Sequence, residues 1–125
     1  MKQQTLTKSE MQVMNILWDL DRGACVNDIL AQYPDPKPAY TTIATFLKIL
    51  TQKGFVEHKK GTGKLLIYSP LISKKKYRRQ VMEEVKDDFF GNSFKSMFSF
   101  FVREEHLTAE EIQELIEQIK EEEKL

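Results

Sequence analysis

The residues with the widest choice of chemistry lie between positions 41 and 52, where polar side chains recur at helical spacing. They are Thr41, Thr42, Thr45, Lys48 and Gln52. A threonine hydroxyl can bond a phosphate or a base edge and its methyl group can contact thymine, whereas Gln suits adenine and Lys suits guanine or phosphate. Residues 40–53 contain no Asp or Glu, which would repel phosphates. The pattern predicts a DNA-contacting helix face; an ordinary solvated face of an amphipathic helix is the alternative.

Other chemistries find little support in the sequence. Cys25 is the only cysteine, and His58 and His106 are far apart in the chain, so no metal site is predicted. Residues 61–64 look like part of a phosphate-binding loop, but the preceding glycine and the following Ser or Thr are missing. Pairs of adjacent carboxylates lack the apolar pocket that acid–base catalysis needs. We therefore expect a protein that is not an enzyme and that binds no cofactor or metal.

Three helices and a hairpin are expected to position these side chains. Apolar residues at helical spacing predict helices over residues 8–20, 26–32 and 41–53, with a proline-rich break before the third. Two β-prone runs, 55–59 and 64–68, flank a glycine-rich tip, which is typical of a hairpin. This order predicts a fold that is mainly α with a small antiparallel β wing, the layout of a winged helix-turn-helix.

Three lysines, Lys59, Lys60 and Lys64, flank the tip of the predicted hairpin. In a wing, such lysines meet the phosphates of a bound duplex. Charged residues on a hairpin also keep its edges from aggregating, which explains them equally well without any DNA.

The remainder of the chain carries a large apolar load. A fourth helix is expected from residue 73 toward 89, and two further helical stripes follow it: Phe94, Met97, Phe98 and Phe101, then Ile112, Leu115, Ile116 and Ile119. A winged domain of this size cannot cover all of these side chains, so a second copy is expected to cover them. Packing within one larger α domain is the alternative. The expected division is 1–71 for DNA binding and 72–125, a helical segment, for dimerisation.

Charge distinguishes the front of the chain from its back, although the whole is neutral. Residues 1–80 hold fourteen Lys and Arg against six Asp and Glu, and residues 81–125 hold five against thirteen. The front part suits a polyanion and the back part would be repelled by one. No apolar stretch approaches the roughly twenty residues of a membrane span, and the N-terminus lacks the apolar segment of a signal peptide. A cytoplasmic protein without membrane insertion is expected.

Four segments carry a family resemblance: residues 6–18 with MNILW at their end, AYTTIATFL at 39–47, KGFV at 53–56 and GKLLIYSP at 63–70. The similarity extends through residues 90–93 to the last helix. Together these segments resemble the BlaI/MecI/CopY family, the penicillinase repressors, which are winged-helix transcriptional regulators of bacteria.

The resemblance implies a homodimer that occupies a pseudo-palindromic promoter operator through the third helix and the wing and thereby blocks transcription. It places DNA contacts on Thr41, Thr42, Thr45 and the wing. Ile49 and Lys64 stand where many family members have Arg. A winged-helix module for protein–protein interaction, without sequence-specific DNA binding, is the competing function, since a fold does not dictate its use.

The resemblance also implies a release mechanism. Members of the family are inactivated when a membrane metalloprotease sensor system leads to cutting of the repressor in the helix before the last one, in some at an Asn-Phe bond. Alignment places Phe100 and Phe101 at this position, so the Asn is missing. Cutting there would remove dimer helices and weaken DNA binding through lost bivalency. Proteolytic release at this bond, by a partner protease system, is a hypothesis from position.

Overall fold

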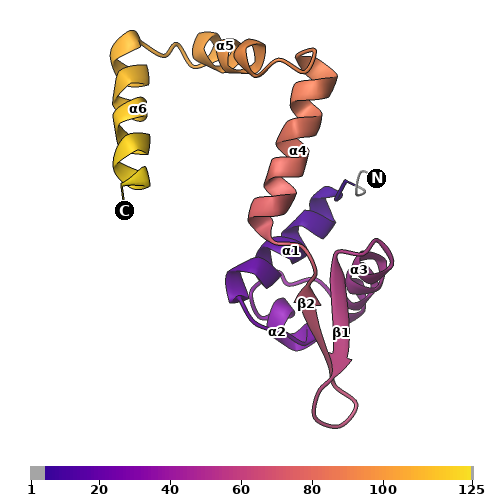
Figure 1. The fold of residues 1–125 in the computed structure, drawn as a ribbon. Coiled ribbons are helices and arrows are strands. Elements are labelled where there is room, and N and C mark those ends of the chain that lie inside the picture. Colours follow the sequence, from indigo (N-terminus) through magenta and orange to yellow (C-terminus); the bar gives the residue numbers. More distant parts are fainter. Residues whose placement is uncertain (1–4, 125) are drawn as a thin grey trace. The chain divides into compact units, whose positions relative to one another are not determined.

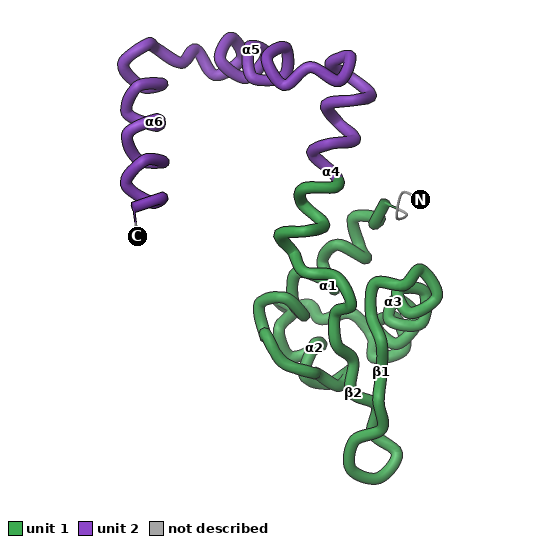
Figure 2. Tube along the Cα trace, in the orientation of Figure 1, with its two compact units in different colours: residues 1–80 green, residues 81–125 purple. Residues whose placement is uncertain are grey.

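The computed structural model describes residues 5–124, whose elements are drawn in Figure 1. In order they are α1 (Lys8–Leu20), α2 (Val26–Leu30), α3 (Tyr40–Gln52), β1 (Val56–Lys60), β2 (Leu66–Pro70), α4 (Lys74–Phe89), α5 (Phe94–Glu104) and α6 (Ala109–Glu123). The chain forms two compact units, one up to Gln80 and one from Val81 on (Figure 2). The boundary falls inside α4, whose first turns belong to the first unit.

A reciprocal cap begins α1. The Thr7 hydroxyl oxygen accepts a hydrogen bond from the Glu10 backbone N–H at 3.2 Å, and the Glu10 carboxylate accepts one from the Thr7 N–H at 2.9 Å. These two bonds satisfy donors that every helix start leaves without a helical partner. The helix is capped by Asp21, the residue after its last one, which takes the left-handed conformation at φ +51°. The predicted span of 8–20 is confirmed.

The proline-rich break after α2 is held by Lys37. Its ammonium group donates hydrogen bonds to the carbonyl oxygens of Leu30, Ala31 and Tyr33. A helix end leaves such carbonyls without partners, so one cation closes the end of α2 and fixes the loop that leads to α3. The helix stops at Leu30, two residues earlier than predicted. Beyond it, the N–H groups of Gln32 and Tyr33 bond carbonyl oxygens three residues back, and not four as in an α-helix.

Gly54 ends α3 at φ +83°, a left-handed conformation in which a side chain would be strained. The next residue turns back on the helix, since the Phe55 N–H donates to the Leu50 carbonyl oxygen at 2.9 Å. This sharp reversal brings the chain directly from α3 into β1.

The hairpin pairs β1 with β2 in antiparallel register, with Lys60 opposite Leu66. Its turn is closed by a hydrogen bond of 2.7 Å from the Gly61 N–H to the Leu65 carbonyl oxygen. Residues 61–65 therefore form the tip, and β2 begins two residues later than the sequence predicted.

The second strand is also attached to the segment before α2. Ala24 and Tyr68 exchange two backbone hydrogen bonds of 2.8 and 2.9 Å, which form an isolated β-bridge. Close approach at this point requires a glycine, because a Cβ added to Gly23 would lie 2.5 Å from a methyl carbon of Ile67. Strand β2 of the wing is thus bonded to β1 along one edge and to Ala24 along the other.

The core of the first unit lies among α1, α2, α3 and the base of the hairpin. Its fully buried side chains are Val13, Met14, Leu17, Ile29, Ile43, Leu47, Leu50, Phe55 and Val56. Burial of each large apolar side chain contributes about 1.5–3 kcal/mol, which makes this cluster the main stabilising element. Three helices with a two-stranded antiparallel wing confirm the predicted fold class.

The first turns of α4 pack on this core. Ser73 caps the helix, as its hydroxyl oxygen accepts from the Lys76 N–H at 3.1 Å, and Ile72 and Tyr77 are both buried. The first unit therefore extends to Gln80, beyond residue 71. The functional division expected at residues 71 and 72 stays a prediction.

The second unit contains the rest of α4 with α5 and α6. Ser93 caps α5 through the Ser96 N–H, and Thr108 and Glu111 form at α6 the same reciprocal cap that begins α1. Over the described part of the chain, no helix has the length and hydrophobicity to cross a bilayer.

Candidate nucleic-acid interface

The structure brings the polar candidates of α3 together on one exposed face. Thr41, Thr42, Thr45, Lys48 and Gln52 are all exposed. The opposite face holds Ile43, Leu47 and Leu50, which have no exposed surface and fix the rotation of the helix against the core. Because the apolar stripe is fully used in packing, the polar face has only solvent or a ligand to contact.

The hydroxyl groups on this face differ in what they can still bond. Thr45 Oγ1 donates to the Thr41 carbonyl oxygen at 2.9 Å, so its proton is engaged and its lone pairs point outward as acceptors. Thr51, six residues further on, donates to the Leu47 carbonyl oxygen and is half-buried. The exposed hydroxyl of Thr45 therefore suits a donor on a base edge, such as the amino group of adenine or cytosine.

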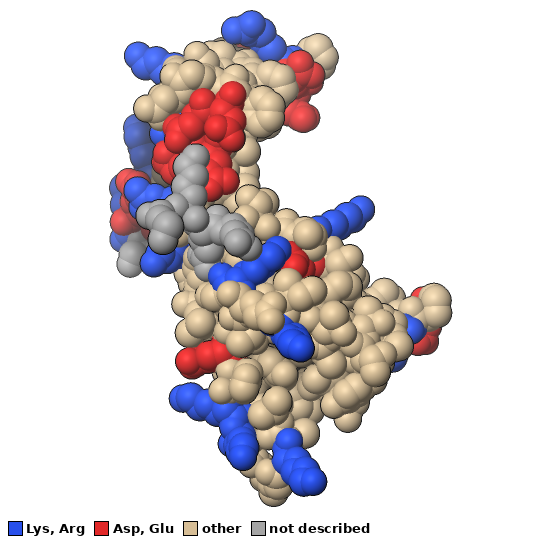
Figure 3. Space-filling view, turned by 90° about the vertical axis from the view of Figure 1, so that its right-hand side faces the viewer, with Lys and Arg blue, Asp and Glu red and all other residues tan. Residues whose placement is uncertain are grey.

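The wing supplies three exposed lysines at the far end of the hairpin. Lys59 and Lys60 close β1, and Lys64 lies in the turn. Figure 3 shows the side on which α3 lies, with basic side chains gathered at its lower end over the hairpin. Among residues 5–124, the ammonium group of none of these lysines forms a hydrogen bond or an ion pair. Their charge is available for phosphate.

Three other cations of the first unit hold contacts within the fold. Lys37 closes α2, Lys53 pairs with Glu10 at 2.7 Å, and Arg22 pairs with Asp28 at 3.3 Å. Lys48 on α3 resembles the wing lysines instead, because it is exposed and has no such partner within the described residues. These three cations are thus engaged in the fold, whereas the four lysines on α3 and the wing are open to a ligand. The first turn of α4 carries three more exposed lysines, Lys74, Lys75 and Lys76.

One exposed side chain of this region was missed by reasoning from the sequence. Tyr40, the first residue of α3, is 50 % exposed and directly precedes Thr41. It lies near Tyr68, whose pKa is raised by burial and, to a lesser degree, by the Tyr40 phenol. Tyr40 carries no charge and lies three residues before Ile43, a spacing that continues the apolar stripe and predicts a buried side chain. Only its place beside the threonines could have singled it out.

The remaining predicted residues lie in the second unit. Six of the eight dimerisation candidates are exposed: Phe94, Phe98, Phe101, Leu115, Ile116 and Ile119. Met97 is buried at 8 % exposure, and Ile112 is half-buried. Phe94 and Phe98 stack with parallel rings 6.1 Å apart, which leaves a continuous apolar strip on α5.

Phe100 and Phe101 lie inside α5, the helix before the last one. Both side chains are 44 % exposed, and their rings contact each other edge to face at 5.3 Å. Over the described residues, no group of His, Cys, Asp and Glu side chains is placed to hold a metal ion.

Comparison with known proteins decides the family. The model of the penicillinase repressor family matches residues 6–121, which include both the α3 face and the apolar helices of the second unit. The chain belongs to the penicillinase repressor family. The resemblance inferred from the sequence segments is thereby confirmed, and the members of this family are regulatory repressors rather than enzymes.

Individual relatives agree along nearly their whole length. The methicillin resistance regulatory protein MecI of Staphylococcus aureus strain N315 is 29 % identical over 111 residues, which cover 88 % of this repressor and 89 % of MecI. The penicillinase repressor of Bacillus licheniformis is 28 % identical over 117 residues, covering 93 % and 90 %. That of Staphylococcus aureus is 26 % identical over 115 residues, covering 91 % and 90 %. The protein is accordingly a transcriptional repressor of the penicillinase family.

Proposed function

We propose that this repressor acts as a homodimer that occupies a pseudo-palindromic promoter operator. In each copy, α3 reads base edges in the major groove through Thr41, Thr42, Thr45, Lys48 and Gln52. The wing binds backbone phosphates through Lys59, Lys60 and Lys64. As a regulator of transcription in bacteria, it acts in the cytoplasm, where the chromosome lies.

The exposed face of α3 carries this proposal. It presents hydroxyl, amide and ammonium groups without a single carboxylate, while the apolar side of the same helix is completely buried. Side chains of these types bond base edges and phosphates, and a carboxylate among them would be repelled. The exposed Lys48 of α3 and the three exposed wing lysines add the positive charge that binding to a duplex requires.

Dimerisation is supported by the apolar surface of the second unit. Phe94 is 67 % exposed, and the exposed residues of α6 include Leu115, Ile116 and Ile119 at 40–46 %. Apolar surface of this kind on several helices is typical of an interface that a partner covers. A second copy is the simplest partner, because a two-fold dimer presents two recognition helices about 34 Å apart, one turn of DNA.

Release by proteolysis between Phe100 and Phe101 is the further part of the proposal. The bond lies in α5 beside the candidate dimer residues, so a cut there would separate the two recognition helices of a dimer and remove their bivalent binding. A protease needs an extended substrate, and α5 must therefore open locally before it is cut. The agent we propose is a sensor protease system.

Selection of duplexes from a random pool tests operator binding directly. We expect enrichment of a sequence with two inverted half-sites, and an affinity for it that falls steeply with salt because several lysines meet phosphates. Enrichment of no sequence, together with weak binding that ignores sequence, would instead favour a winged-helix module for protein interaction. Sedimentation of the same sample measures whether the binding species is a dimer.

A further inference from the structure

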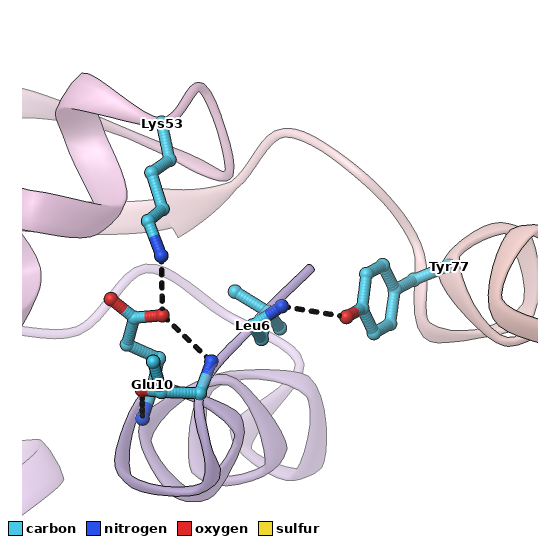
Figure 4. Close-up of polar contacts among 5 residues, drawn as sticks. Leu6, Glu10, Lys53 and Tyr77 are labelled. Carbon is cyan, nitrogen blue, oxygen red and sulfur yellow. Dashed lines mark hydrogen bonds and ion pairs between the residues drawn. The ribbon is translucent and has the colours of Figure 1, made fainter. Parts of the chain in front are cut away.

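Three parts of the first unit meet at one corner: the start of α1, the end of α3 and the first turns of α4 (Figure 4). Lys53, directly after α3, reaches Glu10 with 2.7 Å between its ammonium nitrogen and Glu10 Oε1. The same carboxylate oxygen accepts the Thr7 N–H. On the other side, the Tyr77 hydroxyl oxygen accepts a hydrogen bond of 3.0 Å from the Leu6 N–H. Helices α3 and α4 are thus tied to the same short segment, residues 6–10.

These contacts are shielded from solvent. The side chains of Glu10 and Lys53 are 5 % and 20 % exposed, and Tyr77 and Leu6 are buried. A buried charge needs its partner, and a buried N–H needs its acceptor, much more than exposed groups do. The contacts among Leu6, Glu10, Lys53 and Tyr77 therefore favour one arrangement of the three helices. We call this set of contacts the joint.

The ring of Tyr77 strengthens the same joint. It meets the ring of Phe55 edge to face at 5.5 Å and lies 6.1 Å from that of Trp18. Phe55 is fully buried and turns back onto α3 through its hydrogen bond to the Leu50 carbonyl oxygen. Tyr77 consequently contacts the segment that follows α3 with its ring and the segment that precedes α1 with its hydroxyl.

We propose that Lys53 and Tyr77 are positioning residues that fix α3 relative to the first turns of α4, and that this joint sets the spacing of half-sites that the repressor accepts. The inference rests on the proposed binding of a dimer to an operator. In such a dimer, the distance between half-sites mirrors the distance between recognition helices. The helix that leads from each winged unit toward the candidate dimer residues is α4, and it starts at this joint. A loosened joint lets each α3 adapt to a displaced half-site.

The test uses the selected operator and a series in which one or two base pairs are inserted between its half-sites. Each inserted base pair rotates one half-site about the axis by about a tenth of a turn. We expect the wild-type full-length protein to lose about tenfold in affinity or more with one inserted pair, as for a mismatched site. Tyr77→Phe keeps the ring contacts and removes the acceptor, and Lys53→Met keeps most of the aliphatic stem and removes the charge. In both variants we expect this loss to shrink to about threefold or less.

Two controls separate positioning from stability. Ile29→Val trims a fully buried side chain of α2, away from the joint, and Arg22→Gln removes an exposed ion pair with Asp28. Both should keep the wild-type dependence on spacing, and Lys53→Arg should restore it because the ammonium is replaced by another cation. Thermal melts confirm that every variant is folded at the temperature of the binding assay.

The outcomes distinguish this inference from the function on which it rests. Variants at Tyr77 and Lys53 that melt at lower temperature yet keep the full wild-type loss with an inserted base pair would overturn the inference and leave the operator-binding dimer intact. A wild-type protein that selects no duplex, or that binds all spacings equally, would overturn the proposed dimeric operator binding itself.

Discussion

Thr45 Oγ1 donates its proton to the carbonyl oxygen of Thr41, one turn earlier in α3, over 2.9 Å. This bond orients an exposed hydroxyl so that its lone pairs face outward. A side chain that is fixed before binding loses little conformational entropy when the ligand arrives, so its bond to the ligand contributes more of its strength to affinity.

Substitution at Thr45 should therefore separate the contribution of its side-chain shape to operator binding from that of its hydroxyl hydrogen bond. Thr45→Val preserves the branched shape and the methyl group, and we expect it to cost about 1–3 kcal/mol of discrimination at one base pair, the value of one specific contact. Thr45→Glu places a carboxylate against the duplex and should abolish operator binding while the fold persists. Gel shifts with the selected operator and its single-base variants measure both effects. Operator binding by Thr45→Glu at wild-type strength would remove α3 from the interface.

The wing lysines should account for part of the salt dependence. In Lys59→Gln/Lys60→Gln/Lys64→Gln, we expect the slope of log K against log salt concentration to fall by about 0.9 for each phosphate that a lysine no longer neutralises. The matched control is Lys74→Gln/Lys75→Gln/Lys76→Gln, which removes the same number of exposed charges from the first turn of α4. An equal fall in the control would assign the effect to net charge and not to the wing.

The apolar strip of the second unit predicts the behaviour of a dimer variant. Phe98→Ser/Phe101→Ser removes two rings that are 37 % and 44 % exposed in one chain. If a partner covers them, removal of each ring costs about 2 kcal/mol or more, and the two together weaken dimerisation about a thousandfold. Sedimentation should then show monomers. The control is Lys95→Ala, which changes an exposed polar residue of the same helix; an unchanged dimer in the double variant would place the interface elsewhere.

The Glu10 carboxyl predicts a pH dependence of folding. Burial by itself raises the pKa of Glu10, but the hydrogen bonds from Lys53 and Thr7 outweigh it and hold the pKa below its ordinary value of 4.5. A group whose pKa is lowered on folding stabilises the protein above its unfolded pKa, and this contribution is lost as the pH falls through the folded value. We expect the free energy of unfolding in urea to drop below about pH 4.5 less steeply in Glu10→Gln than in the wild type. Parallel curves would show that other carboxylates control acid unfolding.

Helix starts could be predicted from the sequence, because the residues that cap a helix lie within a few positions of one another. The caps formed by Thr7 with Glu10 and by Thr108 with Glu111 depend on residues three positions apart, and both helix starts were therefore predictable. The start of β2 was predicted two residues too early, because the size of a hairpin turn depends on backbone bonds that side-chain type specifies only weakly.

The residues of the candidate site and of the joint also differ in how far they could be predicted from the sequence. The face of α3 follows from helical spacing, so its exposed threonines were identified from the sequence. The contacts of the joint could not be identified from the sequence, because Lys53 and Glu10 are 43 positions apart and Tyr77 and Leu6 are 71 positions apart. Neither pair has a spacing that predicts contact, and only the packed first unit brings its members together.

The uncovered aromatic strip on α5 has a consequence for how sharply a promoter responds. If two copies must meet through Phe94 and its neighbours before they bind an operator, occupancy at low abundance rises with the square of the protein concentration. Halving the number of intact chains then lowers the dimer population about fourfold by mass action. A modest loss of protein would be enough to turn the controlled gene on.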